Sequence, residues 1–577
     1  MKKKIIYLFV LASLAVSGCN KDFLTRYPLD QFTDETYWTS ETNIRTFAYG
    51  FYPKFFPGYG SGWTWGVYFT APGGKLDDDW APTTPPQFVD IVPTSGGGWD
   101  FSWVRKANIF IDRVGKSPLD DATKNHWLGV ARFFRAMAYS ELVNSFGDVP
   151  WYDEVPVETD NETLYKPRES RVSVMEKVME DFQFAAQNVR ENDGNPGLEV
   201  NRWVVLSFMA KMALFEGTWE KYHNTPGGNP EYFLQIAKDA AGEVINEGPF
   251  NIAPGYRSMF NSLDLAGNPE MIMYRRYAEG VLTHALVSYV NREGQTGPNK
   301  DFIDTYLAQD GLPISLSPMY QGDRTIEQVF ANRDPRMRET FNNQVYRPNG
   351  SYNKEGDLMG VSTSGYATWK FLNESVKDGA GGLSNTNYTH APIIRLGEVM
   401  LIYAEAAAEL GNITQADLDM SINRLRERPG IHVAPLQVIG GMPAVNGTVY
   451  DDPERDPTVP PMIWEIRRER RVELAMEGVR RDDLRRWKKY DYIDHYKNPD
   501  LNRGAWLVAS EWVKSDGESW LKDVTLEFGD SGYIIPAPPS VLRRFDNDKF
   551  YLNPIPLNQI TLYSDMGYEL KQNPGWE

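Results

Sequence analysis

The chain contains a single cysteine, Cys19, among 577 residues. One cysteine cannot form an intramolecular disulfide, so the fold must be stabilised by its buried apolar core. Hydrophobic residues make up 41% of the chain and charged residues 24%, which is ordinary globular usage and argues against wholesale disorder. This length has room for several lobes, although one large domain also fits.

The position of Cys19 explains its presence. A positive segment, Lys2 to Lys4, is followed by an apolar stretch from Ile5 to Val16 and then by Ser17-Gly18-Cys19. The apolar stretch is too short for a permanent membrane helix and has the order of a signal sequence. We expect residues 1–18 to be a lipoprotein signal peptide and Cys19 to be the acylated, membrane-anchored N-terminus. A plain secretory signal with an incidental cysteine is the alternative.

Charge and motifs exclude several classes of function. The formal net charge is −18, which disfavours general binding to nucleic acid phosphates. The chain has no P-loop, GxGxxG, HExxH or CxxC motif, and no two of its six histidines lie within five residues of each other. A Ser–His–Asp triad from distant residues stays open. The run Asp77-Asp78-Asp79 has the composition of a glycosidase acid/base site, but a solvated turn or weak cation site is the favoured interpretation.

Helical periodicity dominates outside the insertions. Residues 19–250 form a helical region interrupted at 56–100 by a segment rich in glycine, proline and aromatics, which is typical of loops. Residues 251–390 have few helical runs, and 491–577 form a loop-rich tail. Pro392 suits a first helical turn and Thr414 an N-cap. The expected helices are 126–146, 171–189, 201–219, 232–245, 392–410, 414–428, 461–478 and 479–490.

The unit 392–428 has the length of a tetratricopeptide helix pair, and such pairs recur four times without close mutual identity. Helix pairs of this kind bury their apolar faces by stacking. We therefore predict a mainly α fold, with tetratricopeptide-like helix pairs as scaffold and long loop-rich insertions. In the charged segment 465–486, opposite charges recur at helical spacing. An ion-pair network that supports the helices is favoured there over an anion site.

Several motifs recur in a known order along the chain. Listed from the N-terminus, they are the Cys19 segment, Asp22-Phe23-Leu24, Tyr37-Trp38, Trp103 to Asn108, Ala131 to Ala136, Phe146 to Pro150, Asn268-Pro269-Glu270, Asn332 to Arg336, Arg395 to Glu398, Tyr403 to Ala406, Glu469 to Leu474, Glu477-Gly478 with Arg480, and Gln572 to Trp576. Together they make the chain resemble a SusD/RagB-type outer-membrane lipoprotein over nearly its whole length.

The resemblance implies a surface-exposed outer-membrane lipoprotein that binds oligosaccharides. It also implies a partner, a SusC-like TonB-dependent transporter over which the protein sits as a lid, and binding without catalysis or a cofactor. The region 251–577 would then be the RagB/SusD-type part, with 251–390 a variable insertion and 392–490 helix pairs. A structural Ca²⁺ stays open. A peptide-capturing relative of the same family and, less favoured, a surface glycoside hydrolase are the alternatives.

A sugar site needs exposed aromatic platforms beside polar groups. The insertion 56–100 supplies both, and the resemblance places a ligand-contacting tryptophan just before the Trp103 helix, at Trp80. Alternatively, these aromatics fill a small core of the insertion. Five further tryptophans within helical patterns are expected in the core: Trp127, Trp203, Trp219, Trp464 and Trp487. The candidate ligand-binding residues are Trp80, Trp63, Trp65, Asp78, Asp79, Tyr289, Asn291, Arg292 and Trp369.

Overall fold

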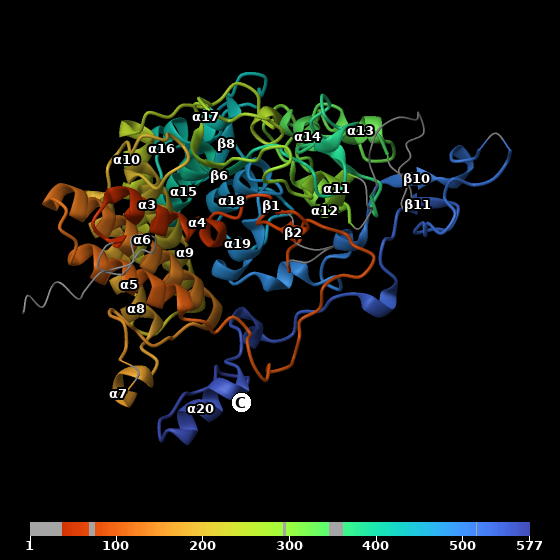
Figure 1. The fold of residues 1–577 in the computed structure, drawn as a ribbon. Coiled ribbons are helices and arrows are strands. Elements are labelled where there is room, and N and C mark those ends of the chain that lie inside the picture. Colours follow the sequence, from red (N-terminus) through yellow and green to blue (C-terminus); the bar gives the residue numbers. More distant parts are fainter. Residues whose placement is uncertain (1–36, 69–75, 158, 292–295, 346–361, 515) are drawn as a thin grey trace, which may run out of the picture.

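The computed structural model describes residues 37–68, 76–157, 159–291, 296–345, 362–514 and 516–577. Long helices gather on one side of the molecule, and short helices with small sheets occupy the other side (Figure 1). Cys19 and Arg292 lie outside the described residues. None of the helices in the described ranges combines the length and apolarity that crossing a membrane requires.

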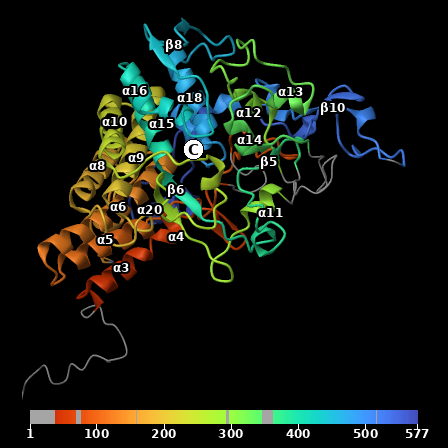
Figure 2. The same cartoon turned by 90° about the horizontal axis from the view of Figure 1, so that it is seen from above.

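The helical side is a stack of neighbouring helices. Contacts run from α5 to α6, α8, α9, α10 and then α15, and these helices lie side by side when seen from above (Figure 2). The predicted mainly α scaffold is therefore confirmed. The elements of this side are α3 (Glu41–Tyr49), α4 (Tyr52–Phe55), α5 (Ser102–Gly115), α6 (Asp121–Phe146), α7 (Asn161–Leu164), α8 (Arg171–Asn188), α9 (Arg202–His223), α10 (Pro230–Glu247) and α15 (Leu396–Glu409).

Local capping sets where the long helices begin. The side chains of Asp120, Ser170 and Asn201 accept hydrogen bonds from backbone N–H groups in the first turns of α6, α8 and α9. Asn229 caps α10, and Pro230 occupies its first position, where no intrahelical N–H is needed. These signals are local in sequence, so each of the four predicted helices begins within five residues of the observed one.

Shorter elements make up the rest of the fold. Within its described residues, the insertion 56–100 contains only the hairpin β1 (Gly60–Ser61) and β2 (Thr64–Trp65) as helices or strands, as its loop-like composition predicts. The remaining elements are β3 (Met271–Arg275), α11 (Leu286–Asn291), α12 (Lys300–Thr305), α13 (Ile326–Phe330), α14 (Arg336–Thr340), β4 (Phe341–Asn342), β5 (Ala367–Thr368), β6 (Ala391–Arg395), α16 (Gln415–Met420), α17 (Ile422–Arg426), β7 (Gln437–Ile439), β8 (Met442–Val445), β9 (Thr448–Val449), α18 (Pro461–Glu473), α19 (Arg480–Arg486), β10 (Trp506–Val508), β11 (Ser531–Tyr533) and α20 (Leu557–Asp565).

The prediction that Pro392 begins a helix is wrong. Residues 391–395 form β6, which pairs antiparallel with β3, and α15 starts only at Leu396. Pro392 is opposite Tyr274 in this two-stranded sheet, where an edge strand tolerates a residue that lacks an N–H. The strand depends on a partner more than 100 residues away, which helical periodicity does not register.

The helices expected at 414–428 and 461–478 also differ from the prediction. The helix expected at 414–428 begins at the Thr414 capping box but breaks at Ser421 into α16 and α17. The helix expected at 461–478 ends at Glu473, because Met476 and Gly478 have positive φ angles of 64° and 81°. The tail is loop-rich as predicted, although it also contains α20 (Figure 1), whose Tyr563 packs into the main core.

The helix-embedded tryptophans pack as expected. Trp127, Trp203, Trp219 and Trp487 are buried, whereas Trp464 is half-buried against the main core. That core joins the helices of the first half to β6, α15 and α18. A second core lies under β1, α11 and β5 and includes Tyr59, Tyr256 and Phe302. The hairpin β1–β2 and α11 lie against this second core.

The charged segment 465–486 is a structural ion-pair network, as predicted. Glu469 bonds Arg336 and Arg426, whereas Arg470 and Arg486 both bond Asp483. All of these side chains are buried. Each guanidinium group offers paired N–H donors to a carboxylate, and buried ionised groups need such charged hydrogen-bonding partners.

Candidate functional site

A short hairpin presents two tryptophans to solvent. In β1–β2, Gly60 is opposite Trp65 and Ser61 is opposite Thr64, so Trp63 lies in the turn. The Thr64 hydroxyl donates to the Ser61 carbonyl at 2.6 Å, and the Gly62 N–H donates to the Thr283 carbonyl at 2.8 Å. The hairpin is thereby closed on itself and fastened to the segment that precedes α11.

Tyr289 on α11 joins both tryptophans. Its ring centroid lies 6.0 Å from that of Trp63 and 5.7 Å from that of Trp65, both edge-to-face, and its hydroxyl donates to the Trp63 carbonyl at 3.1 Å. The neighbouring Leu286 and Val290 are buried in the second core, which holds α11 in place. Tyr289 therefore orients the hairpin from a firmly packed helix.

We call Trp63, Trp65 and Tyr289 the aromatic platform. Trp63 is 49% exposed and Trp65 42% exposed, although apolar rings of this size are usually covered in a protein without a ligand surface. Edge-to-face contacts with Tyr289 restrain the two indoles without covering their faces completely. Such a surface can stack against flat apolar faces of a ligand. Three of the candidate residues predicted from sequence are thus brought together.

Three further candidates, Asn291, Trp369 and Trp80, lie outside the platform. Asn291, at the end of α11, is buried and its side-chain amide donates to the Thr368 carbonyl at 2.8 Å. Trp369 follows directly and is half-buried, with the Arg257 guanidinium 4.3 Å from its ring centroid. Trp80 is half-buried against the second core and forms a β-bridge with Pro298. Ligand contact by these residues stays a prediction.

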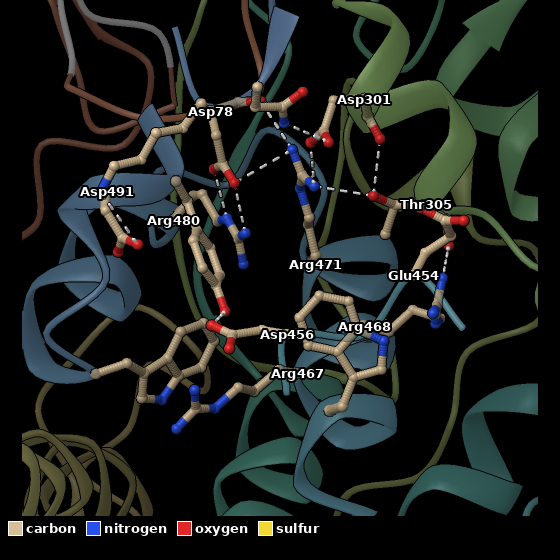
Figure 3. A pocket seen from close by; sticks show the side chains of 15 residues that line it. Asp78, Asp301, Thr305, Glu454, Asp456, Arg467, Arg468, Arg471, Arg480 and Asp491 are labelled. Atoms are coloured by element: carbon tan, nitrogen blue, oxygen red, sulfur yellow. Dashed lines mark hydrogen bonds and ion pairs between the residues drawn. The ribbon is translucent and has the colours of Figure 1, made fainter. Parts of the chain in front are cut away.

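Asp78 and Asp79 are buried rather than part of a solvated turn. Asp78 accepts from Arg480 Nε at 2.7 Å and Nη2 at 2.6 Å, and Asp79 accepts from Arg471 Nε at 2.9 Å (Figure 3). Arg471 also bonds Asp301 at 2.8 Å. The expected solvated turn is wrong because these arginines, about 400 residues away in the sequence, neutralise the carboxylates and permit their burial.

The three consecutive aspartates titrate very differently. Burial opposes ionisation of Asp78, but Arg471 and Arg480 hold its pKa at about 2. Burial raises the pKa of Asp79 to about 6 and that of Asp77 to about 7, with repulsion between the neighbouring carboxylates adding to the shift. Among the described residues, only the Asp79 backbone N–H donates a hydrogen bond to the Asp77 side chain, at 3.3 Å. The ion pairs of Asp78 and Asp79 with the two arginines therefore hold the loop of residues 77–79 in place.

One group within the described ranges has the residue types of a metal site: Glu41, His126 and Asp193. Its carboxylates bond the guanidinium groups of Arg45 and Arg190. The Nδ1 of His126 accepts the Arg190 backbone N–H at 3.2 Å, so the neutral ring carries its proton on Nε2, which faces Asp193. A protonated nitrogen cannot ligate a metal, and this group is better explained as an ion-pair cluster.

The sequence reasoning missed the residues that surround Asp78. Arg480 was assigned to the ion-pair network and Trp464 to the core, yet both also line a cavity together with Tyr492 and Lys497. The helical spacing of these residues does not indicate that they line a cavity. Only the contact between the Asp78 loop and α18–α19 creates the cavity.

Comparisons with known proteins agree with this architecture. The SusD family model matches residues 272–576. A SusD-like protein of Bacteroides ovatus is 24% identical over 516 residues, which cover 85% of this chain and 83% of that protein. A SusD-like protein of Formosa agariphila is 22% identical over 407 residues, covering 67% and 70% of the two chains.

Solved structures show the same fold. A SusD-like carbohydrate-binding protein from Bacteroides fragilis superposes with a TM-score of 0.65 at 20% identity, covering 92% of this chain and 99% of that one. Surface glycan-binding protein A from Bacteroides fluxus gives a TM-score of 0.58 at 16% identity, covering 93% and 100%. Because the family model spans more than half of the sequence and the folds agree along nearly all of it, this chain belongs to the SusD family.

Proposed function

We propose that the protein binds oligosaccharides at the cell surface through the aromatic platform. The observation that carries this proposal is the convergence of two exposed indoles on Tyr289, from segments 226 residues apart. Sugar rings have apolar C–H faces that stack on such rings. Support also comes from two relatives of the same fold, which are described as a carbohydrate-binding protein and a glycan-binding protein.

In this proposal the protein acts as part of a nutrient-uptake pair in the outer membrane. Cys19 carries the lipid anchor, and the folded body covers a SusC-like TonB-dependent transporter as its lid, delivering the bound oligosaccharide. The ordered signal segment and the family membership support this arrangement. Co-purification of a large β-barrel protein after mild detergent extraction tests it, and recovery of the lipidated protein without such a partner would count against it.

The platform supports binding without turnover. Its members are aromatic side chains, which offer stacking surface but no carboxylate pair for glycoside hydrolysis. A reducing-end assay on purified protein distinguishes this from a hydrolase, because turnover would overturn the binding role. No cofactor enters the proposal.

The decisive experiment uses matched aromatic variants. Binding is screened on immobilised starch, xyloglucan, pectin and mucin glycans, with a pool of random peptides beside them. The best ligand is then titrated by calorimetry into wild type, Trp65→Ala and Phe528→Ala. Phe528 is 68% exposed on the β10–β11 lobe and serves as the control for loss of an exposed ring.

Loss of Trp65 should weaken binding by about 5- to 150-fold, since an aromatic stacking contact contributes roughly 1–3 kcal/mol by analogy with bases. Phe528→Ala should bind like wild type, and both variants should melt like wild type because both rings are exposed. Equal binding by wild type and Trp65→Ala would place the ligand elsewhere. Capture of peptides in preference to glycans would favour the peptide-binding alternative.

A further inference from the structure

The cavity beside Asp78 lies between the Asp78 loop and the segment from α18 to residue 498. Its volume is about 290 Å³, and none of the platform residues lines it. Ligand pockets typically start near 300 Å³, so this cavity has room for one sugar-sized ring rather than for an extended chain. Figure 3 shows charged side chains converging on it from several segments.

Arg480 presents unused hydrogen-bonding capacity to this cavity. Its Nε and Nη2 both donate to Asp78, and its Nη1 points toward the open centre of the cavity (Figure 3). Among the described residues, no group accepts from Nη1. By contrast, Asp79, Asp301 and the Asp78 carbonyl occupy all three nitrogens of Arg471. A guanidinium held in place by one carboxylate and free on its other side is suited to an anionic oxygen.

Two aromatic rings supply apolar wall. The Tyr492 hydroxyl donates to Asp456 at 2.6 Å, and the Trp464 indole N–H donates to Asp452 at 3.3 Å. Both rings line the cavity, and with their polar atoms bonded elsewhere they offer carbon faces to an occupant. A ring with apolar C–H groups can pack there while its charged substituent reaches Arg480.

The rim adds polar groups of both kinds. Lys497 is 57% exposed at its side chain and lies 3.8 Å from Asp491, and Glu454 is exposed. Lys497 can donate to ligand hydroxyls and Glu454 can accept from them. The carboxylate of Asp456 is already bonded by Lys489 at 2.6 Å, so it is neutralised toward an entering anion. Hydroxyl partners at the rim favour a sugar acid over an aromatic or aliphatic acid.

We propose that this cavity is a binding site for a hexuronic acid residue, with the ligand carboxylate on Arg480 Nη1 and the pyranose ring between Trp464 and Tyr492. The inference is independent of the aromatic platform, because the two sites share no residue. A chain that carries both sites would recognise an acidic terminal residue separately from the sugars stacked on the platform.

The test is calorimetric titration of the purified chain with D-glucuronate and D-galacturonate. D-Glucose, D-galactose and acetate are the matched probes that lack either the carboxylate or the ring. At least one uronate should bind, and its neutral counterpart should bind about 10- to 100-fold more weakly, as expected for loss of a charge-assisted hydrogen bond. Acetate should bind as weakly as the neutral sugar. Failure of both uronates to bind at about 10 mM, or equal binding of neutral sugar and uronate, would overturn the proposal.

Variants then locate the site. Arg480→Lys keeps a cation beside Asp78 but removes the second donor face, and it should weaken uronate binding about 10- to 100-fold. Lys497→Met changes an exposed rim residue and should weaken it several-fold even if Arg480→Lys melts early. Trp65→Ala, which disables the platform, should leave uronate binding unchanged. Loss of uronate binding in Trp65→Ala but not in Lys497→Met would overturn the cavity assignment without touching the platform proposal.

Discussion

Arg395 and Glu473 form a fully buried ion pair, with Nη1 of the arginine 2.8 Å from Oε1 of the glutamate. Arg395 ends β6 and Glu473 ends α18, and the arginine also donates to the Glu473 carbonyl at 2.9 Å. Glu270, Arg336 and Arg428 belong to the same cluster. Motifs spread over about 200 residues of sequence therefore meet at one point, where each arginine fork satisfies carboxylates from other segments.

Replacing Glu473 by glutamine should destabilise the fold by about 3–5 kcal/mol, because it leaves three buried guanidinium groups with too little negative charge. Burial opposes ionisation of Glu473, but Arg428, Arg395 and Arg336 hold its pKa at about 2. The carboxylate's contribution to stability is thus complete above pH 4.5 and is lost as the pH falls toward 2. Urea unfolding from pH 3 to 7 should show a smaller pH dependence in Glu473→Gln than in wild type.

The control for that measurement is Glu374→Gln. Glu374 is paired with Arg257 at 2.7 Å, but its side chain is 45% exposed. Surface pairs contribute about 0–1 kcal/mol, so this variant should unfold almost like wild type at every pH. Similar losses of unfolding free energy in the two variants would show that burial does not determine how much the Glu473 cluster contributes to stability.

Asp77→Asn should stabilise the protein at pH 8 but not at pH 4. Burial and the neighbouring carboxylates of Asp79 and Asp78 raise the pKa of Asp77 to about 7. Between pH 4 and 7 the folded state holds a proton that the unfolded state has lost, so stability falls as the pH rises through this range.

Asparagine at position 77 does not titrate, and it keeps the acceptor for the Asp79 N–H. The gain at pH 8 should reach at most about 4 kcal/mol, and thermal melts at both pH values measure it. An equal gain in stability at pH 4 would show that the gain does not come from removing a buried, ionised Asp77.

Gly60→Ala should abolish binding at the aromatic platform. Gly60 has a φ of +93°, and a Cβ there would lie 2.0 Å from the Thr64 carbonyl oxygen, so the hairpin would have to open. Gly96→Ala is the matched control, since Gly96 has a φ of +76° with no described atom within 4 Å of its Cβ. Both variants strain the backbone by roughly 1–2 kcal/mol, but only Gly60→Ala displaces Trp63 and Trp65. Glycan titration with tryptophan fluorescence distinguishes them, and retained binding in Gly60→Ala would contradict the role of the hairpin.

Cys19→Ala should release the protein from the membrane fraction. Acyl chains on the cysteine would provide the anchor, and alanine cannot carry them. Fractionation of cells that express the wild type and the variant measures the change, with a high-salt wash to remove peripheral attachment. A variant that stays in washed outer membranes would show that another element anchors the chain.

Local signals in the sequence were sufficient for the long helices and for part of the candidate site. The interval predicted for α8 differs from the observed helix by one residue, because its apolar spacing and the Ser170 cap are both encoded within the segment. The same reasoning marked Trp63, Trp65 and Tyr289 as candidates, because aromatics in loop-like segments are not needed for a helix face. The resemblance to the SusD family also rested on motifs visible in the sequence.

Long-range contacts decided the rest. Pro392 belongs to a strand because β3 offers it a partner, and Asp78 is buried because Arg471 and Arg480 neutralise that loop. The platform exists only where the hairpin meets α11, and the cavity exists only where the Asp78 loop meets α18 and α19. Periodicity and capping act over a few residues, so the sequence by itself determined the helices and the family. Pairing across hundreds of residues depends on which surfaces the folded chain brings together, so only the tertiary structure decided which polar groups are buried and which aromatics form a surface.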